Sequence, residues 1–356
     1  MTTLDVLLPT YRWNSYVRGY IRYLDSIVSD SEVSLRLHIG DNSCNSDKHS
    51  FLRGLNNPNI QVHLNETNVG AYANFQNLFF RSDGDFVLSI GDDDWIHPDV
   101  FAHAAFLAEN SQCSACVGVL AAFPPRMNAA GACFDDRFMG ADAVKRALDY
   151  IRYSLWEHDV NWLALATHRR STLTIYLEYA KRHPFNLYFR DQMLSQIALL
   201  TGPVKGLRHG ISVYKNRPAD ELRGHLENIA GSVDDMGLPP WLYIFYYHYW
   251  LGCEYASLYL YRGIPDGQFA DRLSDADKVF IELFTRFRMT YDKNPAKYEA
   301  HFKEAGISDA MHDVLDDPTA VVALRSLATI FRAHNPEAGK RYADFLRKEM
   351  VVDIGE

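Results

Sequence analysis

The segment FVLSIGDDDWIHPD, residues 86–99, joins a short apolar stretch to three consecutive carboxylates. Its apolar start predicts a buried strand, and the proline that follows the carboxylates suits the first turn of a helix predicted over 98–109. Like charges a few ångströms apart repel, so Asp92, Asp93 and Asp94 together favour a bound cation. Hard oxygen ligands suit Mg²⁺ or Mn²⁺. The competing interpretation is that Asp94 caps the helix while its neighbours are solvated.

Upstream of this segment, short apolar strands alternate with helices, which is the pattern of an α/β sandwich. The expected strands cover 4–9, 33–39 and 60–64, and the expected helices cover 13–28 and 74–80. Ligands of open α/β sheets lie beyond the carboxyl ends of the strands. Two further polar clusters follow strands in this way, Pro9-Thr10-Tyr11 and Asp41-Asn42-Ser43. We therefore expect the three strand ends to form one site.

The residue types at these strand ends suit a nucleotide. Tyr11 can stack on a flat base, and Asp41 can accept a hydrogen bond from a base imino group. The loop Asn68-Val69-Gly70-Ala71 precedes a helix, where backbone N–H groups can meet a phosphate or a ribose. Each cluster is also an ordinary turn sequence when it is taken alone.

The order and spacing of the series LLPTY, IGDNS, ETNVGAYANFQN and FVLSIGDDDWIHPD resemble the GT-A fold glycosyltransferases of family 2. The resemblance covers residues 3–215 and is strongest over the first hundred. It implies a Rossmann-like nucleotide-sugar domain with a mixed, mainly parallel sheet.

The resemblance also implies roles for the residues of this series. Asp41 would pair with the base, and Asp93, with Asp94 close by, would hold a metal, Mn²⁺ or Mg²⁺, bound to the diphosphate. The family pattern is Asp-x-Asp-Asp, and Gly91 stands at its first position here. The residues implied to line the nucleotide site are Pro9, Thr10, Tyr11, Asp41, Asn68, Gly70, Asn74 and Asp92.

Downstream, NLYFRDQMLSQIALL resembles the family's acidic pair at the head of a helix, with Arg190 in place of the usual Glu. The retained Asp191 is the candidate general base, since an attacking hydroxyl must lose a proton; the competing interpretation is a helix N-cap. Candidate contacts to diphosphate or acceptor are His168, Arg169, Arg190, Arg217 and His225.

The function implied is inverting, metal-dependent transfer of a sugar from a nucleoside diphosphate donor to a glycan or glycolipid hydroxyl, in polysaccharide biosynthesis. UDP-sugar is the favoured donor class, with dTDP and GDP left open. Gly91 and Arg190 depart from the family pattern and leave an alternative open. In that alternative the chain is a catalytically silent nucleotide-sugar or glycan binder, or an assembly subunit. A sugar nucleotidyltransferase is disfavoured, because PTYRWNS, residues 9–15, has no glycine where a Gly-rich phosphate loop is expected.

The composition of the chain indicates which partners it binds and in which cellular compartment we expect it. The 356 residues carry a net charge of −9 and no Lys/Arg run, so we expect no nucleic-acid partner. Five cysteines, an odd number, favour a reducing compartment, and the N-terminus lacks the features of a secretory signal. We therefore expect a cytoplasmic protein.

The alternation of strand and helix patterns ends near Pro218, and the sequence beyond it is almost wholly helical in pattern. We therefore predict a GT-A domain over 1–218 and a helical domain over 219–356. Its helices are expected over 239–262, 274–290, 294–305, 318–333 and 336–350, with Ser274 and Asp277 forming a capping pattern. The aromatic segment from Trp241 to Tyr261 reads as a helix buried in a domain or at a subunit contact, with docking on the inner membrane face as the less favoured reading. Acceptor binding, homo-oligomerisation and membrane docking stay open for this domain.

Overall fold

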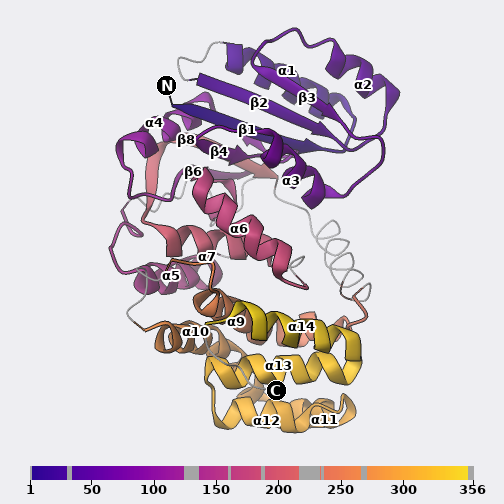
Figure 1. The fold of residues 1–356 in the computed structure, drawn as a ribbon, viewed down its shortest axis with the longest axis vertical. Coiled ribbons are helices and arrows are strands. Elements are labelled where there is room, and N and C mark those ends of the chain that lie inside the picture. The colour runs from indigo at the N-terminus through magenta and orange to yellow at the C-terminus, as the bar shows by residue number, and fades with distance from the viewer. Residues whose placement is uncertain are drawn as a thin grey trace. The chain divides into compact units, whose positions relative to one another are not determined.

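The computed structural model describes residues 2–29, 34–123, 136–158, 162–185, 189–215, 233, 236–265 and 271–351 (Figure 1). The chain divides into two compact units. The first comprises Met1–Ala141, Asp149–Thr174 and Gly202–Asn216. The second comprises Asp142–Leu148, Ile175–Thr201 and Arg217–Glu356. The second unit thus takes in two stretches that precede residue 218.

The first unit is built on an eight-stranded sheet with the order β3-β2-β1-β4-β7-β6-β8-β5. The first four strands of this order are mutually parallel, and β7 then runs antiparallel to both of its neighbours. The strands are β1 Thr3–Thr10, β2 Ser34–Asp41, β3 Ile60–Leu64, β4 Phe86–Ser89, β5 Trp95–Ile96, β6 Ala115–Phe123, β7 Thr167–Arg169 and β8 Val204–Lys215. The predicted fold class, α/β with a mixed, mainly parallel sheet and a helical region, is confirmed.

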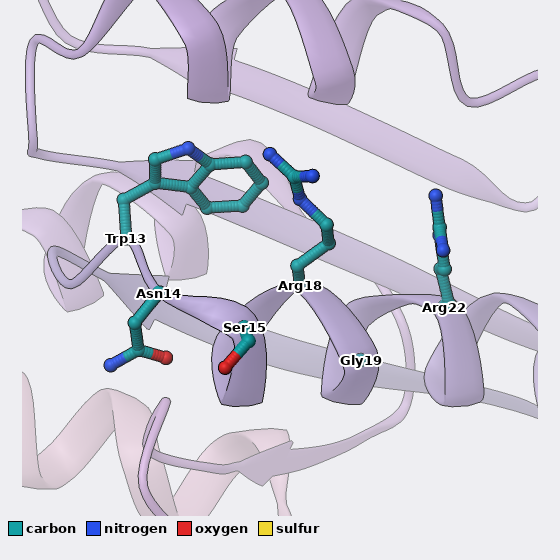
Figure 2. Close-up of a pocket in the computed structure, with 6 residues that line it drawn as sticks. All are labelled: Trp13, Asn14, Ser15, Arg18, Gly19 and Arg22. Atoms are coloured by element: carbon teal, nitrogen blue, oxygen red, sulfur yellow. The ribbon is translucent and has the colours of Figure 1, made fainter.

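Helix α1, Ser15–Ser29, covers one face of this sheet because its apolar residues recur at helical spacing. Val17, Ile21 and Leu24 are buried against the strands. Trp13, which precedes the helix, is partly buried against the same core, and Arg18 lies beside it, with Arg22 one turn further along (Figure 2). The amphipathic helix predicted over 13–28 is confirmed.

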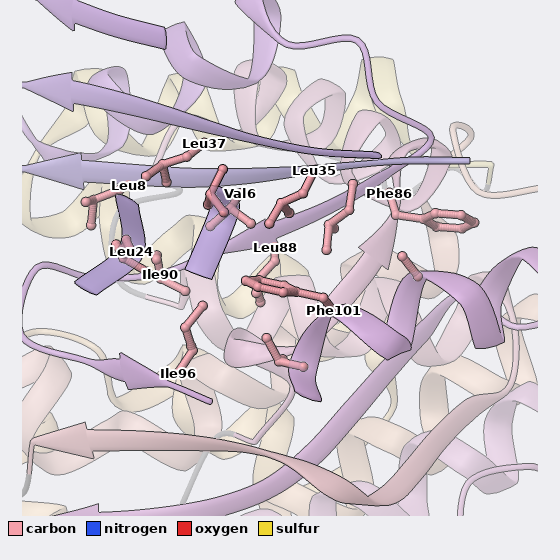
Figure 3. Packing of buried hydrophobic residues seen from close by; sticks show 14 of the residues in the cluster. Val6, Leu8, Leu24, Leu35, Leu37, Phe86, Leu88, Ile90, Ile96 and Phe101 are labelled. Carbon is pink, nitrogen blue, oxygen red and sulfur yellow. The ribbon is translucent and has the colours of Figure 1, made fainter. Parts of the chain in front are cut away.

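The core lies between the sheet and the helices α1 and α4, Ala102–Glu109, and Figure 3 shows its packing. Alternate strand residues such as Val6 and Leu8 point into it, because successive side chains of a strand leave opposite faces. The opposite face is covered by α3, Ala71–Arg81, whose Leu78 lies 3.0 Å from where a Cβ would stand on Gly40. That glycine therefore lets α3 approach the sheet.

The helix predicted over 98–109 begins as a 3₁₀ turn, Pro98–Phe101, and continues as α4, Ala102–Glu109. The side chain that caps the turn is His97, whose Nδ1 accepts from the Asp99 N–H at 3.3 Å, and not Asp94. The helix that follows β2 is α2, Ser46–Arg53, which we did not predict. The remaining segments between β6 and β8 are α5 Ala143–Ile151, a π-helix Arg152–His158, a 3₁₀ turn Trp162–Leu165, α6 Arg170–Arg182 and α7 Arg190–Thr201.

A buried carboxylate anchors the amino end of the sheet. Asp5 is fully buried and accepts from Arg36 Nε at 2.8 Å and from Arg170 Nη2 at 3.2 Å. Burial opposes ionisation of Asp5, but hydrogen bonds from His38, Arg36 and the Gly84 N–H outweigh it and lower its pKa to about 2. This charge network belongs to the fold and lies at the end of β1 opposite the candidate site.

The second unit is helical beyond residue 240. Its helices there are α9 Trp241–Leu260, α10 Arg272–Lys293, α11 Pro295–Glu304, α12 Ser308–Asp316, α13 Ala320–His334 and α14 Pro336–Glu349. Five of these helices were predicted, and α12 was not. The predicted capping pattern at Ser274 is wrong, because Asp271 caps α10 and accepts from the N–H groups of Leu273 and Ser274.

The aromatic helix α9 is packed inside the helical unit, as we predicted. Its Tyr249 and Trp250 are fully buried, and the Tyr249 hydroxyl donates to the Ala323 carbonyl on α13 at 2.9 Å. None of the helices in the described part of the chain is both long and apolar enough to cross a bilayer.

Candidate functional site

The carboxyl ends of β2, β1 and β4 lie side by side, because these three strands are neighbours in one parallel arrangement. Thr10, the last residue of β1, is in register with Asp41, the last residue of β2. The Gly91–Asp94 loop leaves β4 on the other side of β1. The sheet order therefore brings the three predicted clusters together.

Asp92 organises the loop that follows β1. Its Oδ2 accepts from the Thr10 hydroxyl at 2.9 Å and from the Tyr11 and Arg12 N–H groups at 2.9 and 3.0 Å. Its Oδ1 accepts from Arg12 Nη1 at 3.2 Å. Asp92 is buried, so these hydrogen bonds compensate the loss of water around its carboxylate. The loop that follows β1 and the loop Gly91–Asp94, here called the acidic loop, thus form one connected structure.

Arg12 joins the acidic loop through its side chain as well. Its Nη1 lies 2.7 Å from Asp93 Oδ2, and this ion pair is half-exposed. Arg12 therefore places one positive charge beside the clustered carboxylates. The sequence analysis did not single out Arg12, although it directly follows Tyr11.

Gly91 allows the carboxylates of Asp93 and Asp94 to converge. A Cβ at Gly91 would stand 2.8 Å from Asp94 Oδ2 and 3.0 Å from Asp93 Oδ1, closer than ordinary contact. The Gly91 N–H also donates to Asp94 Oδ2 at 3.2 Å. Both acidic side chains thus occupy the space over the glycine, which a Cβ at this position would fill.

Two exposed tyrosines stand beside the acidic loop. Tyr11 is 58% exposed, which suits the predicted stacking on a base. The Tyr16 hydroxyl lies 3.5 Å from the Asp94 carbonyl oxygen. Burial and then the charge of Asp94 raise the pKa of Tyr16, so this phenol stays neutral at physiological pH.

Asp41 is fully buried, and two basic side chains of α2 contact its carboxylate. Its Oδ1 lies 2.7 Å from Lys48 Nζ, and its Oδ2 lies 2.9 Å from His49 Nε2. The Ser43 hydroxyl donates to Oδ2 at 2.9 Å as well. A base that pairs with Asp41, as predicted, must therefore replace one of these partners.

Lys48 links the ends of β1 and β2. Besides Asp41, its ammonium donates to the Thr10 hydroxyl and to the Arg12 carbonyl, both at 2.9 Å. Burial lowers the pKa of Lys48, while the charges of Asp41 and Asp92 oppose that shift. Neither Lys48 nor His49 was predicted, because a Lys-His pair in a polar segment carries no signal of burial.

The loop before α3 is held by asparagine side chains. Asn42 Nδ2 donates to Asn68 Oδ1 at 2.8 Å, and the Gly70 N–H donates to the same oxygen at 3.0 Å. Asn74 Nδ2 donates to the Gly40 carbonyl at 2.7 Å. Gly70 adopts φ +84°, which favours glycine. The predicted nucleotide residues Asn68, Gly70 and Asn74 thus lie together beside β2.

His168 and Arg169 lie in β7 and contact backbone carbonyls. His168 Nε2 lies 3.0 Å from the Leu163 oxygen, and burial lowers the pKa of His168 to about 4. Arg169 donates to the carbonyls of Leu107 at 2.7 Å and Cys113 at 2.9 Å. These contacts stabilise the fold around α4, and a part for either residue in substrate binding stays a prediction.

The other predicted residues lie elsewhere in the chain. Arg190 and Asp191 begin α7 in the second unit, and the Asp191 side chain is exposed. Pro9 is within β1. Arg217 and His225 lie outside the described residues.

The carboxylates of the acidic loop are hard oxygen donors, the type of ligand that Mg²⁺ and Mn²⁺ prefer. Across the described ranges, no group of three or more His, Cys, Asp or Glu side chains is arranged to hold a metal ion. Mg²⁺ does not require such a group, because it often keeps only one or two carboxylates and completes its shell with water and substrate phosphates. The convergence of Asp93 and Asp94 over Gly91 fits an ion of this kind.

Neither a protein-family model nor a curated protein sequence matches the chain. Solved structures do match its fold. S. aureus TarS, residues 1–349, superposes with a TM-score of 0.54 at 15% identity, over 98% of this chain and 85% of that one. The same fragment in complex with UDP-GlcNAc gives 0.53 at 16% identity over 98% and 85%, and in complex with UDP it gives 0.53 at 15% over 96% and 89%. At this identity the likeness establishes the fold.

Proposed function

We propose that the chain is an inverting glycosyltransferase that moves a sugar from a UDP-sugar to a hydroxyl of a glycan or glycolipid. The observation that carries the proposal is the connected site at the ends of β1, β2 and β4, where Asp92 fixes the loop of Thr10, Tyr11 and Arg12. The solved structures of similar fold that hold UDP-GlcNAc and UDP support this donor class.

In this proposal the first unit binds the donor. Tyr11 stacks on the base, and Asp41 reads its imino edge after exchanging one of its present donors. The ribose and diphosphate lie toward Asp92 and Asp93. Arg12 donates to the diphosphate oxygens, since its guanidinium is the half-exposed cation beside the acidic loop.

Asp93, with Asp94 beside it, would hold the metal. A bound Mg²⁺ or Mn²⁺ neutralises charge that develops on the leaving diphosphate as a Lewis acid. The protein's own part is to keep the two carboxylates converged, which Gly91 permits.

Asp191 would accept the proton of the attacking hydroxyl. In an inverting transfer the acceptor oxygen bonds to the anomeric carbon while the bond to the diphosphate oxygen breaks, and the hydroxyl proton passes to the carboxylate. An exposed Asp in the first turn of α7 is a carboxylate that an acceptor can reach.

Titration of the purified chain with UDP, with Mn²⁺ or with EDTA, tests the proposal. We expect UDP to bind more tightly with the metal, and Asp93→Asn to remove that difference. An equal titration with dTDP, GDP and CDP tests the base. Absence of binding for every nucleotide at millimolar concentration would overturn the proposal and favour a catalytically silent assembly subunit.

A further inference from the structure

A basic groove lies on the outer side of α1, separate from the acidic loop. Its cavity of about 460 Å³ is lined by Trp13, Asn14, Ser15, Arg18, Gly19 and Arg22. Figure 2 shows Trp13, Arg18 and Arg22 pointing to the same side of the helix. The lining contains two guanidinium groups and no carboxylate. In a chain of net charge −9, this is a local concentration of positive charge.

The two arginines are held in place by aromatic rings. The Arg18 guanidinium lies 4.7 Å from the centre of the Trp13 ring, and that of Arg22 lies 5.7 Å from the centre of Phe51 on α2. Stacking engages the flat face of a guanidinium and leaves its N–H edge for an anion. Neither group forms an ion pair with any carboxylate in the described ranges, whereas Arg12 and Arg36 of the same unit do.

Gly19 gives a second, independent indication. A glycine inside a helix costs about 1 kcal/mol relative to alanine. Gly19 does not adopt a positive φ, and no heavy atom lies within 4 Å of the position of its missing Cβ. Neither backbone geometry nor packing therefore requires a glycine here, and its effect is to leave the floor of the groove open.

We propose that this groove binds a phosphate group of the acceptor substrate. Two guanidinium edges on adjacent helical turns suit phosphate oxygens, and the N-terminal end of α1, where Asn14 Oδ1 accepts from the Val17 N–H, adds positive potential. The lining of the groove includes Trp13, which directly follows Arg12, so one end of the groove adjoins the loop of Thr10, Tyr11 and Arg12 along the chain. The Arg18 guanidinium lies over the Trp13 ring. This positive charge beside the indole favours an anion over a bilayer as the occupant of the groove. The assignment of the phosphate to an acceptor rests on the proposed function.

The test is calorimetric titration of the full chain with tripolyphosphate at low salt in EDTA, which prevents metal–phosphate complexes. We expect Gly19→Leu, which places a side chain on the floor of the groove without a change of charge, to weaken binding at least about tenfold. Arg18→Ala with Arg22→Ala should do the same. Arg53→Ala, which removes one exposed positive charge from α2 outside the groove, controls for the loss of a single charge and should change the affinity less than about twofold.

Gly19→Leu also separates binding from folding, since leucine in open space on a helix should leave the thermal midpoint unchanged or raise it. Unchanged affinity in Gly19→Leu, or an equal loss in Arg53→Ala, would overturn the groove as a site. Binding of phosphatidylglycerol vesicles without binding of tripolyphosphate would overturn the acceptor assignment. A parallel titration of the wild type with UDP and Mn²⁺ separates the test of the groove from the test of the proposed function. If the wild type does not bind UDP, the proposed function is contradicted, and the result for tripolyphosphate in the groove still holds.

Discussion

Replacement of Gly91 by alanine should weaken metal-dependent donor binding without unfolding the chain. The new Cβ would stand 2.8 Å from Asp94 Oδ2 and 3.0 Å from Asp93 Oδ1, while ordinary contact begins at 3.4 Å. Both carboxylates must therefore move away by roughly half an ångström. Gly91 does not adopt a positive φ, so alanine is compatible with the backbone.

The expected loss of affinity can be estimated from how closely metal sites keep their ligand distances. Ligand distances in such sites hold within about 0.2 Å, so a displacement of this size disturbs the donor set. Changes that misalign ligands typically reduce metal affinity by about 10- to 100-fold. We expect a loss of this size in the affinity for UDP with Mn²⁺. Gly91→Asp should lose at least as much, because its side chain is larger than that of alanine.

The assay is calorimetric titration with UDP, in Mn²⁺ and in EDTA. Gly140→Ala is the matched control, since no heavy atom lies within 4 Å of its Cβ position. It should bind like the wild type, and all variants should agree in EDTA. Wild-type affinity of Gly91→Ala in Mn²⁺ would refute the reasoning, because the converged carboxylates would then not hold the metal.

Three further changes test other parts of the structure. Asp191→Asn should abolish sugar transfer but keep UDP affinity; transfer at the wild-type rate would exclude Asp191 as the base. Lys48→Met should lower the free energy of unfolding by about 3–5 kcal/mol, because Asp41 then stays buried without its closest cation; urea denaturation measures this, and a loss below about 1 kcal/mol would contradict it. The pKa of Asp5 is lowered from 3.8 to about 2, so its ionised form adds stability that is present above pH 4 and is lost as the pH falls toward 2. In urea titrations the wild type should therefore lose about 2 kcal/mol more than Asp5→Asn over this range, and parallel losses would refute the assignment.

Strands β1 to β4 could be predicted because each carries a local signal, an alternation or an apolar run, whereas the two-residue strand β5 was not predicted. The alternation over 33–39 and 60–64 and the apolar run at 4–9 gave β2, β3 and β1 with small shifts at their ends. The convergence of the three polar clusters also followed from sequence, since the carboxyl ends of parallel neighbours meet at one edge.

The sequence by itself determined the α/β class, the helical character beyond residue 240 and the polar residue types at the strand ends, all of which depend on residues close together in the chain. Only the tertiary structure decided which side chains meet across long separations. It paired Arg12 with Asp93 and Lys48 with Asp41, and it turned His168 toward a backbone carbonyl. Burial of a charged side chain depends on a partner far away in the chain, so no local pattern records it.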